Sequence, residues 1–204
     1  MSQLPKRSEH HKWIIEALVR KYGPISQVGL HELTQFRRGT ISSITRELLS
    51  EGKLLECGRS NNPRGRKQVL LQLNPKFGFI VALQFDDETV TAGIVDLTPA
   101  ILHQVSEPSC LTRGKEGLIR QLRACVRRVI ADAGFDRALL LGIGIADPGL
   151  VDSRLGVTLT SSTIDFWKQV PLKAIFEQEF AVGVQLESKT RAKTLAEQML
   201  GAGD

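Results

Sequence analysis

The chain has 204 residues, with 27 Lys and Arg, 22 Asp and Glu, and three Cys. This length suffices for one large domain or two small ones, and the composition excludes a disordered, highly charged tail. No apolar run approaches the roughly 18 residues of a membrane helix, and the N-terminus MSQLPKRSEHHK lacks the apolar core of an export signal. We therefore expect a folded cytoplasmic protein that has no membrane partner. The three widely spaced cysteines predict neither a disulfide framework nor a zinc site.

Charge is distributed unevenly along the chain. Residues 1–75 carry 13 Lys and Arg against 6 Asp and Glu, a net charge of +7, whereas residues 76–204 have a net charge of −2. A basic first third favours binding to a polyanion such as nucleic acid, although basic residues also cluster on ordinary solvated helix faces.

Apolar periodicity and turn residues predict three helices and then two strands in residues 1–75. The predicted helices are residues 8–22, a short helix that begins near Ser26, and Thr40–Ser50 after a tight turn at 36–39. The predicted strands are 53–57 and 68–73, on either side of the loop GRSNNPRGRK. This order is typical of a winged helix-turn-helix, so residues 1–75 are predicted to be a DNA-binding domain.

Asn74-Pro75 marks the expected boundary to a second domain, residues 76–204. Its predicted strands are 77–85, 89–96, 101–107, 139–145 and 182–186. Its predicted helices are 114–133, 171–180 and 190–200. The order β-β-β-α-β-α-β-α predicts an α/β fold that resembles one ribonuclease-H-like lobe, of the actin and hexokinase type.

The third predicted helix is the first candidate site. If Ile41, Ile44 and Leu48 face the core, the polar residues of this helix and of its entry face outward. These candidate DNA-binding residues are Arg37, Arg38, Thr40, Ser42, Ser43 and Arg46. Arg can pair with guanine, and Ser or Thr hydroxyls can contact bases or phosphates in the major groove. The alternative is a small helical bundle with ordinary surface polar residues.

The loop between the two predicted strands is the second candidate site, with Arg64, Gly65, Arg66 and Lys67. An extended Arg-Gly-Arg segment can follow the floor of a narrow A·T-rich minor groove, because Gly lets the backbone approach closely. The alternative is a solvated basic wing that touches phosphates alone.

Residues 76–204 show no arrangement that predicts catalysis, so we expect no catalytic residue, no cofactor and no metal site. The triplet Asp86-Asp87-Glu88 follows the first predicted strand, where three acids would repel nucleotide phosphates unless a metal intervenes. The triplet is interpreted as an acidic hairpin turn, and the alternative is that it holds a divalent cation. Residues 147–152 form a turn after a buried strand, a place where α/β proteins hold ligands. The acids of this turn could bind a polyol or simply shape the turn.

Five stretches of the chain resemble the ROK family of repressors and sugar kinases. They are ELTQFRRGTISSITRELLSEGKLLECG, PRGRKQVLLQLNPKFGFIVAL, GIGIADPGLVDS, FWKQVPLKAIFEQEF and LESKTRAKTLAEQMLGAG. The regulator branch of this family joins a winged helix to a sugar-kinase-like body, so the resemblance implies a transcriptional repressor that binds double-stranded DNA. It also implies that the basic linker reads a minor groove, which agrees with the interpretation of Arg64, Gly65 and Arg66.

The sequence departs from the kinases of this family at two motifs. Their phosphate loop, Asp-x-Gly-Gly-Thr, is replaced by Gln84 and the triplet 86–88, and their Glu-Asn-Asp-Ala motif is replaced by Glu187-Ser188-Lys189-Thr190. A lysine ammonium cannot take a proton from a sugar hydroxyl as the family's aspartate would. The departures therefore predict that kinase activity is lost.

Relatives continue past LAEQMLGAG into a second lobe, so the resemblance gives this chain half of a sugar or sugar-phosphate effector pocket. The candidate ligand-binding residues are Asp147, Gly149 and Glu187. We expect impaired sugar sensing. An exposed apolar patch near the C-terminus and the 147–152 loop predicts self-association, such as a homodimer, or poor solubility. The alternative is that side chains collapse over the patch and leave a stable monomer. The alternative function is a degenerate sugar-kinase-like fragment that acts as an interaction scaffold.

Overall fold

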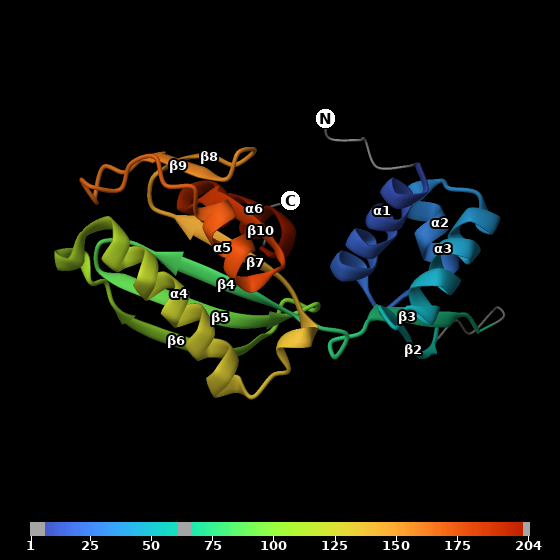
Figure 1. The fold of residues 1–204 in the computed structure, drawn as a ribbon. Coiled ribbons are helices and arrows are strands. Elements are labelled where there is room, and N and C mark those ends of the chain that lie inside the picture. Colours follow the sequence, from blue (N-terminus) through green and yellow to red (C-terminus); the bar gives the residue numbers. More distant parts are fainter. Residues whose placement is uncertain (1–6, 61–66, 202–204) are drawn as a thin grey trace. The chain divides into compact units, whose positions relative to one another are not determined.

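Two hydrophobic cores form along the chain, one before and one after the Asn74-Pro75 turn. The computed structural model describes residues 7–60 and 67–201. Its contacts divide the chain into two compact units, Met1–Phe77 and Gly78–Asp204 (Figure 1).

Three helices form the first unit because each carries one apolar stripe. They are α1 (Arg7–Tyr22), α2 (Gln27–Thr34) and α3 (Arg38–Ser50). The buried side chains of the stripes are Ile15, Val19, Leu30, Ile41, Ile44 and Leu48. The predicted start of the third helix at Thr40 was two residues late, because the amides of both Thr40 and Ile41 already donate to the carbonyl of Arg37.

A small antiparallel sheet completes the first unit. Its strands are β1 (Ile25–Ser26), β2 (Leu54–Arg59) and β3 (Val69–Leu73), in the order β1-β3-β2. The two predicted strands are present, whereas β1 is too short to show a period in the sequence. Ser26 pairs with Leu70 in this sheet and also caps α2, because its hydroxyl accepts from the Gly29 amide at 3.1 Å.

A five-stranded mixed sheet forms the second unit, in the order β10-β7-β4-β5-β6. Its strands are β4 (Phe79–Phe85), β5 (Thr89–Asp96), β6 (Ile101–Pro108), β7 (Leu140–Asp147) and β10 (Gly183–Ser188). The strands β4, β5 and β6 form the predicted antiparallel meander, and β7 and β10 run parallel to β4. The structure is therefore α/β, as the order of predicted elements indicates.

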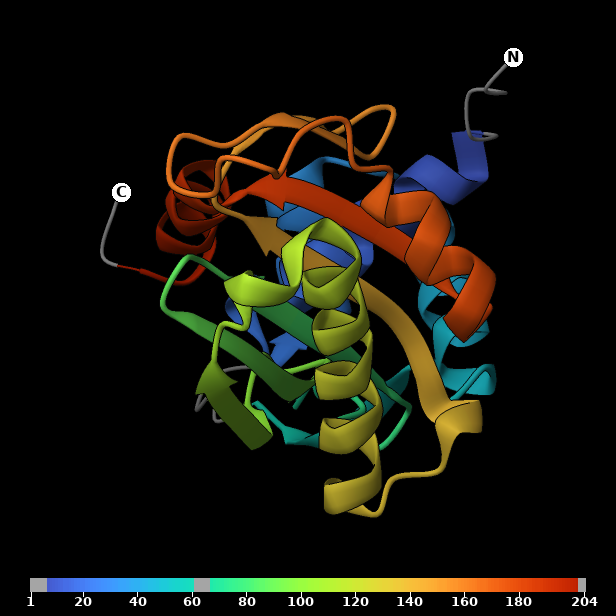
Figure 2. The same cartoon turned by 60° about the vertical axis from the view of Figure 1, so that its left-hand side comes forward.

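Two helices cover one face of this sheet, α4 (Gly114–Ala133) and α5 (Leu172–Phe180), and α6 (Lys189–Leu200) follows β10 (Figures 1 and 2). Strand β4 points alternate side chains into the core, and Phe85 meets Trp167 edge to face with ring centroids 5.3 Å apart. The core residues of β4 are Phe79, Val81, Leu83 and Phe85.

The segment between β7 and α5 contains a hairpin that the sequence pattern did not predict, β8 (Leu150–Asp152) and β9 (Val157–Thr160). Both strands are short and lack a sustained alternation of apolar residues, so residues 147–152 read as a plain turn. Short 3-10 turns at Leu111–Arg113 and Arg137–Leu139 flank α4 and were also not predicted.

Candidate functional site

Helix α3 separates apolar and polar residues between two faces, as predicted. Ile41, Ile44 and Leu48 are buried, so the opposite face carries the polar candidates. Arg37, Arg38, Ser43 and Arg46 are exposed, while Thr40 and Ser42 are half-buried. The spacing of four between Arg38, Ser42 and Arg46 places these three residues on one side of the helix.

The turn between α2 and α3 has three residues, Gln35, Phe36 and Arg37. Gln35 adopts the left-handed conformation, with φ 58°, and its amide donates to the carbonyl of His31. The Nδ1 atom of the His31 ring lies 2.7 Å from the carbonyl oxygen of Phe36. These contacts fix the direction in which the chain enters α3 and therefore the place of Arg37 at its start.

A buried hydroxyl joins α2 to α3. The Thr45 hydroxyl donates to the carbonyl of Ile41 at 2.9 Å and accepts from Nε2 of Gln27 at 3.0 Å. This pair was not predicted from the sequence. Thr45 occupies a core position next to Ile44. A polar residue at such a position indicates a buried hydrogen bond, so the sequence did contain a signal for this contact.

An ion-pair network joins α1 to the end of α3. The Lys12 ammonium contacts Glu47 at 2.9 Å and Glu51 at 2.5 Å. Hydrogen bonds to Glu51 and then Glu47 raise the pKa of Lys12, and the bond from Lys12 lowers the pKa of Glu51. This network lies at the end of α3, whereas the candidates Arg37 and Arg38 lie at its start.

A polar hollow of about 510 Å³ lies at the start of α3. His11, Gln35, Phe36, Arg37 and Thr40 line it, and the His11 and Phe36 rings pack with centroids 4.3 Å apart. Arg37 is the N-cap residue of α3, and within the described residues its side chain makes no capping hydrogen bond. The predicted wing residues Arg64, Gly65 and Arg66 lie outside the described residues, and Lys67 is exposed beside β3.

Asp147, a candidate ligand-binding residue, is fully buried. Its Oδ1 accepts from the Gly149 amide at 2.7 Å, and its Oδ2 accepts from the Thr158 hydroxyl at 2.6 Å and from Trp167 Nε1 at 2.9 Å. Burial raises the pKa of the Asp147 carboxyl, and the three hydrogen bonds oppose that rise. In this arrangement Asp147 shapes the loop and faces no open space. This agrees with the alternative that the acids of the 147–152 turn shape the turn.

Gly149 also has a structural reason to be present. A Cβ atom at this position would meet the carbonyl oxygen of Thr160, and Oδ1 of Asp147 would be 3.0 Å away. The glycine therefore lets the β8–β9 hairpin pack closely against the loop.

Glu187 lies at the end of β10, and its carboxylate is already engaged. Oε1 accepts from the Ser153 hydroxyl and from the Ser188 amide, each at 2.9 Å, and Oε2 lies 3.4 Å from Nε of Arg191. The structure thus does not bring Glu187 into a common ligand shell with the buried carboxylate of Asp147.

The structure brings together two residues from the motifs that depart from the kinases. The Lys189 ammonium donates to Oδ2 of Asp86 at 2.6 Å, across 103 residues of sequence. This hydrogen bond lowers the pKa of Asp86 to about 2, against the effect of partial burial. Both residues belong to motifs that were singled out from the sequence, but no sequence pattern predicted that they pair.

A profile of the ROK family matches residues 81–204. The chain belongs to the ROK family. It is 27% identical over 177 residues to the xylose repressor of Caldicellulosiruptor bescii, with 87% of this chain and 44% of that protein covered. It is 28% identical over 189 residues to the xylose repressor of Bacillus subtilis, with 90% and 47% covered.

The ROK chain spans about half the length of these curated relatives. Among solved structures, a ROK family transcriptional regulator described as a homologue of Escherichia coli Mlc matches with a TM-score of 0.72 at 23% identity, covering 94% of this chain and 49% of that one. The ROK hexokinase of Thermus thermophilus matches with a TM-score of 0.54 at 28% identity, covering 61% and 40%. The fold is therefore the α/β fold of ROK proteins.

Two findings concern residues 7–60 and 67–201, the part of the chain that the structure describes. No helix there is long and apolar enough to cross a membrane. No group of three or more His, Cys, Asp or Glu side chains among them is placed to hold a metal ion.

Proposed function

We propose that this ROK chain is a sequence-specific DNA-binding transcriptional regulator of the repressor type, without kinase activity. Residues 1–75 would be a winged helix-turn-helix domain, and residues 76–204 a ribonuclease-H-like lobe. The observation that carries the proposal is the polar, basic outer face of α3, which follows a short, rigid turn after α2. Relatives named as repressors match about nine-tenths of the chain, a span that must include much of this unit.

In this proposal α3 enters the major groove. Arg38, Ser42 and Arg46 would face base edges, because they share one side of the helix, and Arg38 and Ser42 lie in its N-terminal half. Ser43 extends the same polar surface toward the backbone. An Arg that pairs bidentately with guanine supplies discrimination between bases, and the hydroxyls supply shorter contacts.

Phosphate contacts would form at the start of α3. Arg37 and Thr40 line the polar hollow there, and helix amides without a side-chain cap suit an anionic oxygen. Such contacts fix the register of a protein on the duplex without reading sequence. The pairing of Thr45 with Gln27 would keep α2 and α3 at a constant angle as this surface binds.

The wing is proposed to make two kinds of contact with DNA. Arg64 and Arg66, with Gly65 between them, would enter a narrow minor groove, and Lys67 would contact a phosphate. Replacing Arg66 by Ala should reduce the preference for A·T-rich flanks, which a binding titration on paired A·T-rich and G·C-rich duplexes measures. Replacing Lys67 by Ala should weaken all duplexes alike and reduce the slope of log affinity against log salt concentration by about one. Equal losses on both flanks for Arg66→Ala would leave a wing that touches phosphates alone.

Sugar phosphorylation is the second candidate function, because the ROK hexokinase shares this fold. The pairing of Lys189 with Asp86 argues against it. The protonated ammonium of Lys189 donates a hydrogen bond to the Asp86 carboxylate, so it cannot act as the base that deprotonates a sugar hydroxyl. The carboxylates at 86–88 would also repel nucleotide phosphates without a bound cation.

The lobe is proposed to sense sugar poorly or not at all. Asp147 has its oxygens committed to buried donors, and Glu187 is held by Ser153 and Arg191. A polyol would have to displace these internal partners, which lowers the net gain of each new hydrogen bond.

One experiment separates the regulator from the kinase. The purified chain is titrated with a randomised duplex library at several salt concentrations, and the same sample is assayed for ATP-dependent phosphorylation of a panel of sugars. We expect sequence-selective, salt-dependent retention on DNA and no sugar phosphate. Retention that is equal on all sequences, or turnover of any sugar, would contradict the proposed function. Retention on no duplex, together with no turnover, would instead favour the interaction scaffold.

A further inference from the structure

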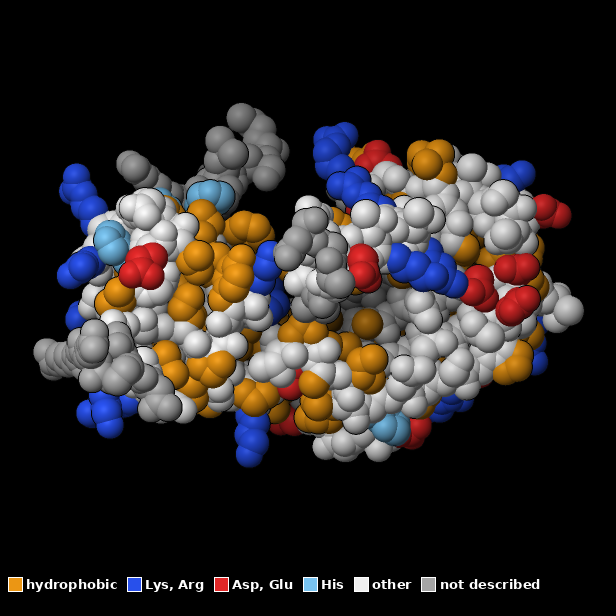
Figure 3. All heavy atoms as spheres, turned by 180° about the vertical axis from the view of Figure 1, so that it is seen from behind, with side chains coloured by type: hydrophobic (Ala, Val, Ile, Leu, Met, Phe, Trp, Pro, Cys, Tyr) orange, Lys and Arg blue, Asp and Glu red, His pale blue; other side chains and the backbone are white. Residues whose placement is uncertain are grey.

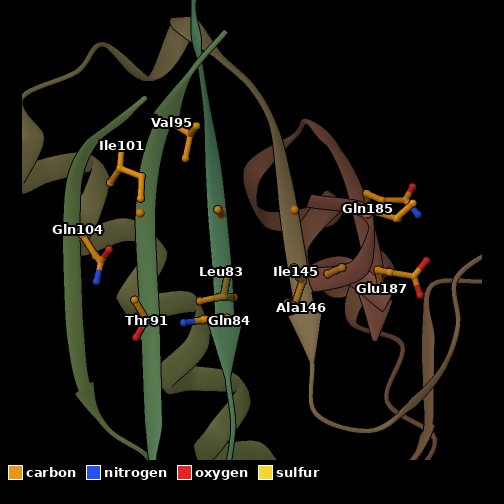
Figure 4. Close-up of a pocket in the computed structure, with 15 residues that line it drawn as sticks. Leu83, Gln84, Thr91, Val95, Ile101, Gln104, Ile145, Ala146, Gln185 and Glu187 are labelled. Atoms are coloured by element: carbon orange, nitrogen blue, oxygen red, sulfur yellow. The ribbon is translucent and has the colours of Figure 1, made fainter. Parts of the chain in front are cut away.

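Two hollows of similar size in this chain differ in their chemistry. The hollow of about 480 Å³ on the five-stranded sheet is a recess with hydrophobic side chains in and around it, as the view from behind shows (Figure 3). Among the described residues that line it, Glu187 is the charged one, and Gln84 and Gln185 add neutral amides (Figure 4). An apolar hollow whose charge is negative does not suit a phosphate.

The polar hollow of about 510 Å³ in the first unit has the opposite charge. Arg37 and Thr40 line it from the start of α3, and His11 lines it from α1. The described residues that line this hollow include no Asp or Glu. The ion pairs that the structure gives within residues 7–60 use Lys12 and Lys53 and do not involve Arg37. The hollow therefore offers a guanidinium and an imidazole to an anion.

The fold holds the His11 ring at this place. Ile15, one helical turn later, is fully buried, so this side of α1 faces the core. The His11 ring packs on the Phe36 ring, with centroids 4.3 Å apart. Phe36 is itself fixed, because its amide donates to the Thr34 hydroxyl at 3.2 Å and its carbonyl oxygen lies 2.7 Å from Nδ1 of His31. His11 is thus half-buried against a fixed turn.

The titratable and charged groups on the segments that adjoin His11 are mostly basic. They are Glu9, His10 and Lys12 of α1, His31 of α2, and Arg37 at the start of α3. Glu9 and His10 are exposed, and Lys12 is paired with two glutamates at the other end of α3. His31 and Arg37 adjoin the Phe36 peptide against which His11 packs. An anion in the hollow therefore meets basic groups from three elements.

We propose that His11 is a phosphate-contact residue of the DNA interface, and that its ring takes up a proton when a phosphate enters the hollow. This inference rests on the DNA-binding function proposed above. Unperturbed histidines titrate near about pH 6.5, and an anion within about 4–6 Å favours the protonated form. The protonated ring donates to a phosphate oxygen beside Arg37 and Thr40, so α1 and α3 hold one phosphate between them.

DNA affinity then depends on pH. The complex binds more protons than the free chain near neutral pH, so the affinity falls as pH rises. If the phosphate moves the titration of one histidine by about one pH unit, the affinity falls about three- to tenfold between pH 6 and pH 8. The loss is the same for every duplex sequence, because a phosphate contact carries no base information.

Fluorescence anisotropy titrations of the full chain at pH 6, 7 and 8 and constant ionic strength test the inference. The probe is the duplex that the chain enriches most from the randomised library. His11→Phe keeps an aromatic ring against Phe36 and cannot take up a proton, so its affinity should change by about twofold or less over this range. His11→Lys keeps a cation throughout, so it should be equally insensitive to pH and bind more tightly than His11→Phe.

The matched control is His10→Phe. His10 is the adjacent histidine on α1, is exposed, and stacks on Trp13 with ring centroids 6.3 Å apart, so its variant should keep the full pH dependence. Circular dichroism at each pH checks that every variant is folded. An affinity of the unmodified chain that is constant from pH 6 to pH 8, or a pH dependence that persists in both His11 variants, would overturn the inference and leave the proposed function standing. Binding to no duplex at any pH would overturn both.

Discussion

Replacing Asp147 by Ala is expected to lower the free energy of unfolding of the second unit by about 3 kcal/mol or more, because three buried donors lose their acceptor. These donors are the Gly149 amide, the Thr158 hydroxyl and Trp167 Nε1. The Trp167 ring is fully buried against Phe85, so the core must either hold an unpaired N–H or rearrange. Urea unfolding followed by tryptophan fluorescence measures the change, because Trp167 moves from the core to solvent.

The pH dependence of stability is a second way to measure the contribution of the Asp147 carboxyl. Burial raises the pKa of Asp147 in the folded chain, so the folded state binds the proton more tightly than the unfolded state does. This group's contribution to stability is therefore greatest below its ordinary pKa and declines as pH rises through the raised value. Asp147→Asn keeps an acceptor oxygen and cannot ionise, so that decline should be absent from its stability profile.

Asp152→Ala is the matched control, because this carboxylate is half-buried and accepts from the Leu155 amide in the same hairpin. We expect a loss of about 1 kcal/mol or less. Equal losses for Asp147→Ala and Asp152→Ala would show that the buried network contributes no more than an ordinary turn.

Most helices and strands could be predicted from the sequence, because their stabilising interactions are periodic and local. The apolar stripe of α3 and the alternation in β4 each bury one face, so spacing alone indicates the element. The start of α3 was misplaced because Arg38 and Gly39 are poor signals of a helix start, and the backbone carbonyl of Arg37 closes the first turn without a side-chain cap.

The partners of the polar side chains could not be predicted, because they are distant in sequence. Lys189 and Asp86 meet because β10 and β4 both end at the same edge of the sheet, with β7 between them. Asp147 meets Trp167 because the β8–β9 hairpin folds back over the loop, and that hairpin had no clear sequence pattern. The sequence can identify such polar groups, but the topology of the fold determines whether they face a ligand or one another.

Replacing Arg38 by Ala is expected to reduce discrimination at one base pair by about 1–3 kcal/mol, or roughly 5- to 150-fold in relative affinity. The prediction rests on the proposed docking of α3. Arg38 is the first residue of the helix and is exposed, so its guanidinium can reach base edges without moving the core residue Ile41. Competitive gel-shift titrations on a duplex library measure the preference at each position, and Ser42→Ala should give a smaller loss at a neighbouring position.

The control for Arg38 must remove an equal charge elsewhere. Arg120 is exposed on α4 in the second unit, so Arg120→Ala lowers the net charge by the same amount without touching α3. A phosphate contact or a general electrostatic effect would weaken all sequences together, because it carries no base information. If Arg38→Ala keeps the base preferences of the unmodified chain and merely binds more weakly, then α3 does not read bases through Arg38. Loss of preference at one position, with Arg120→Ala unchanged, would assign Arg38 to that base pair.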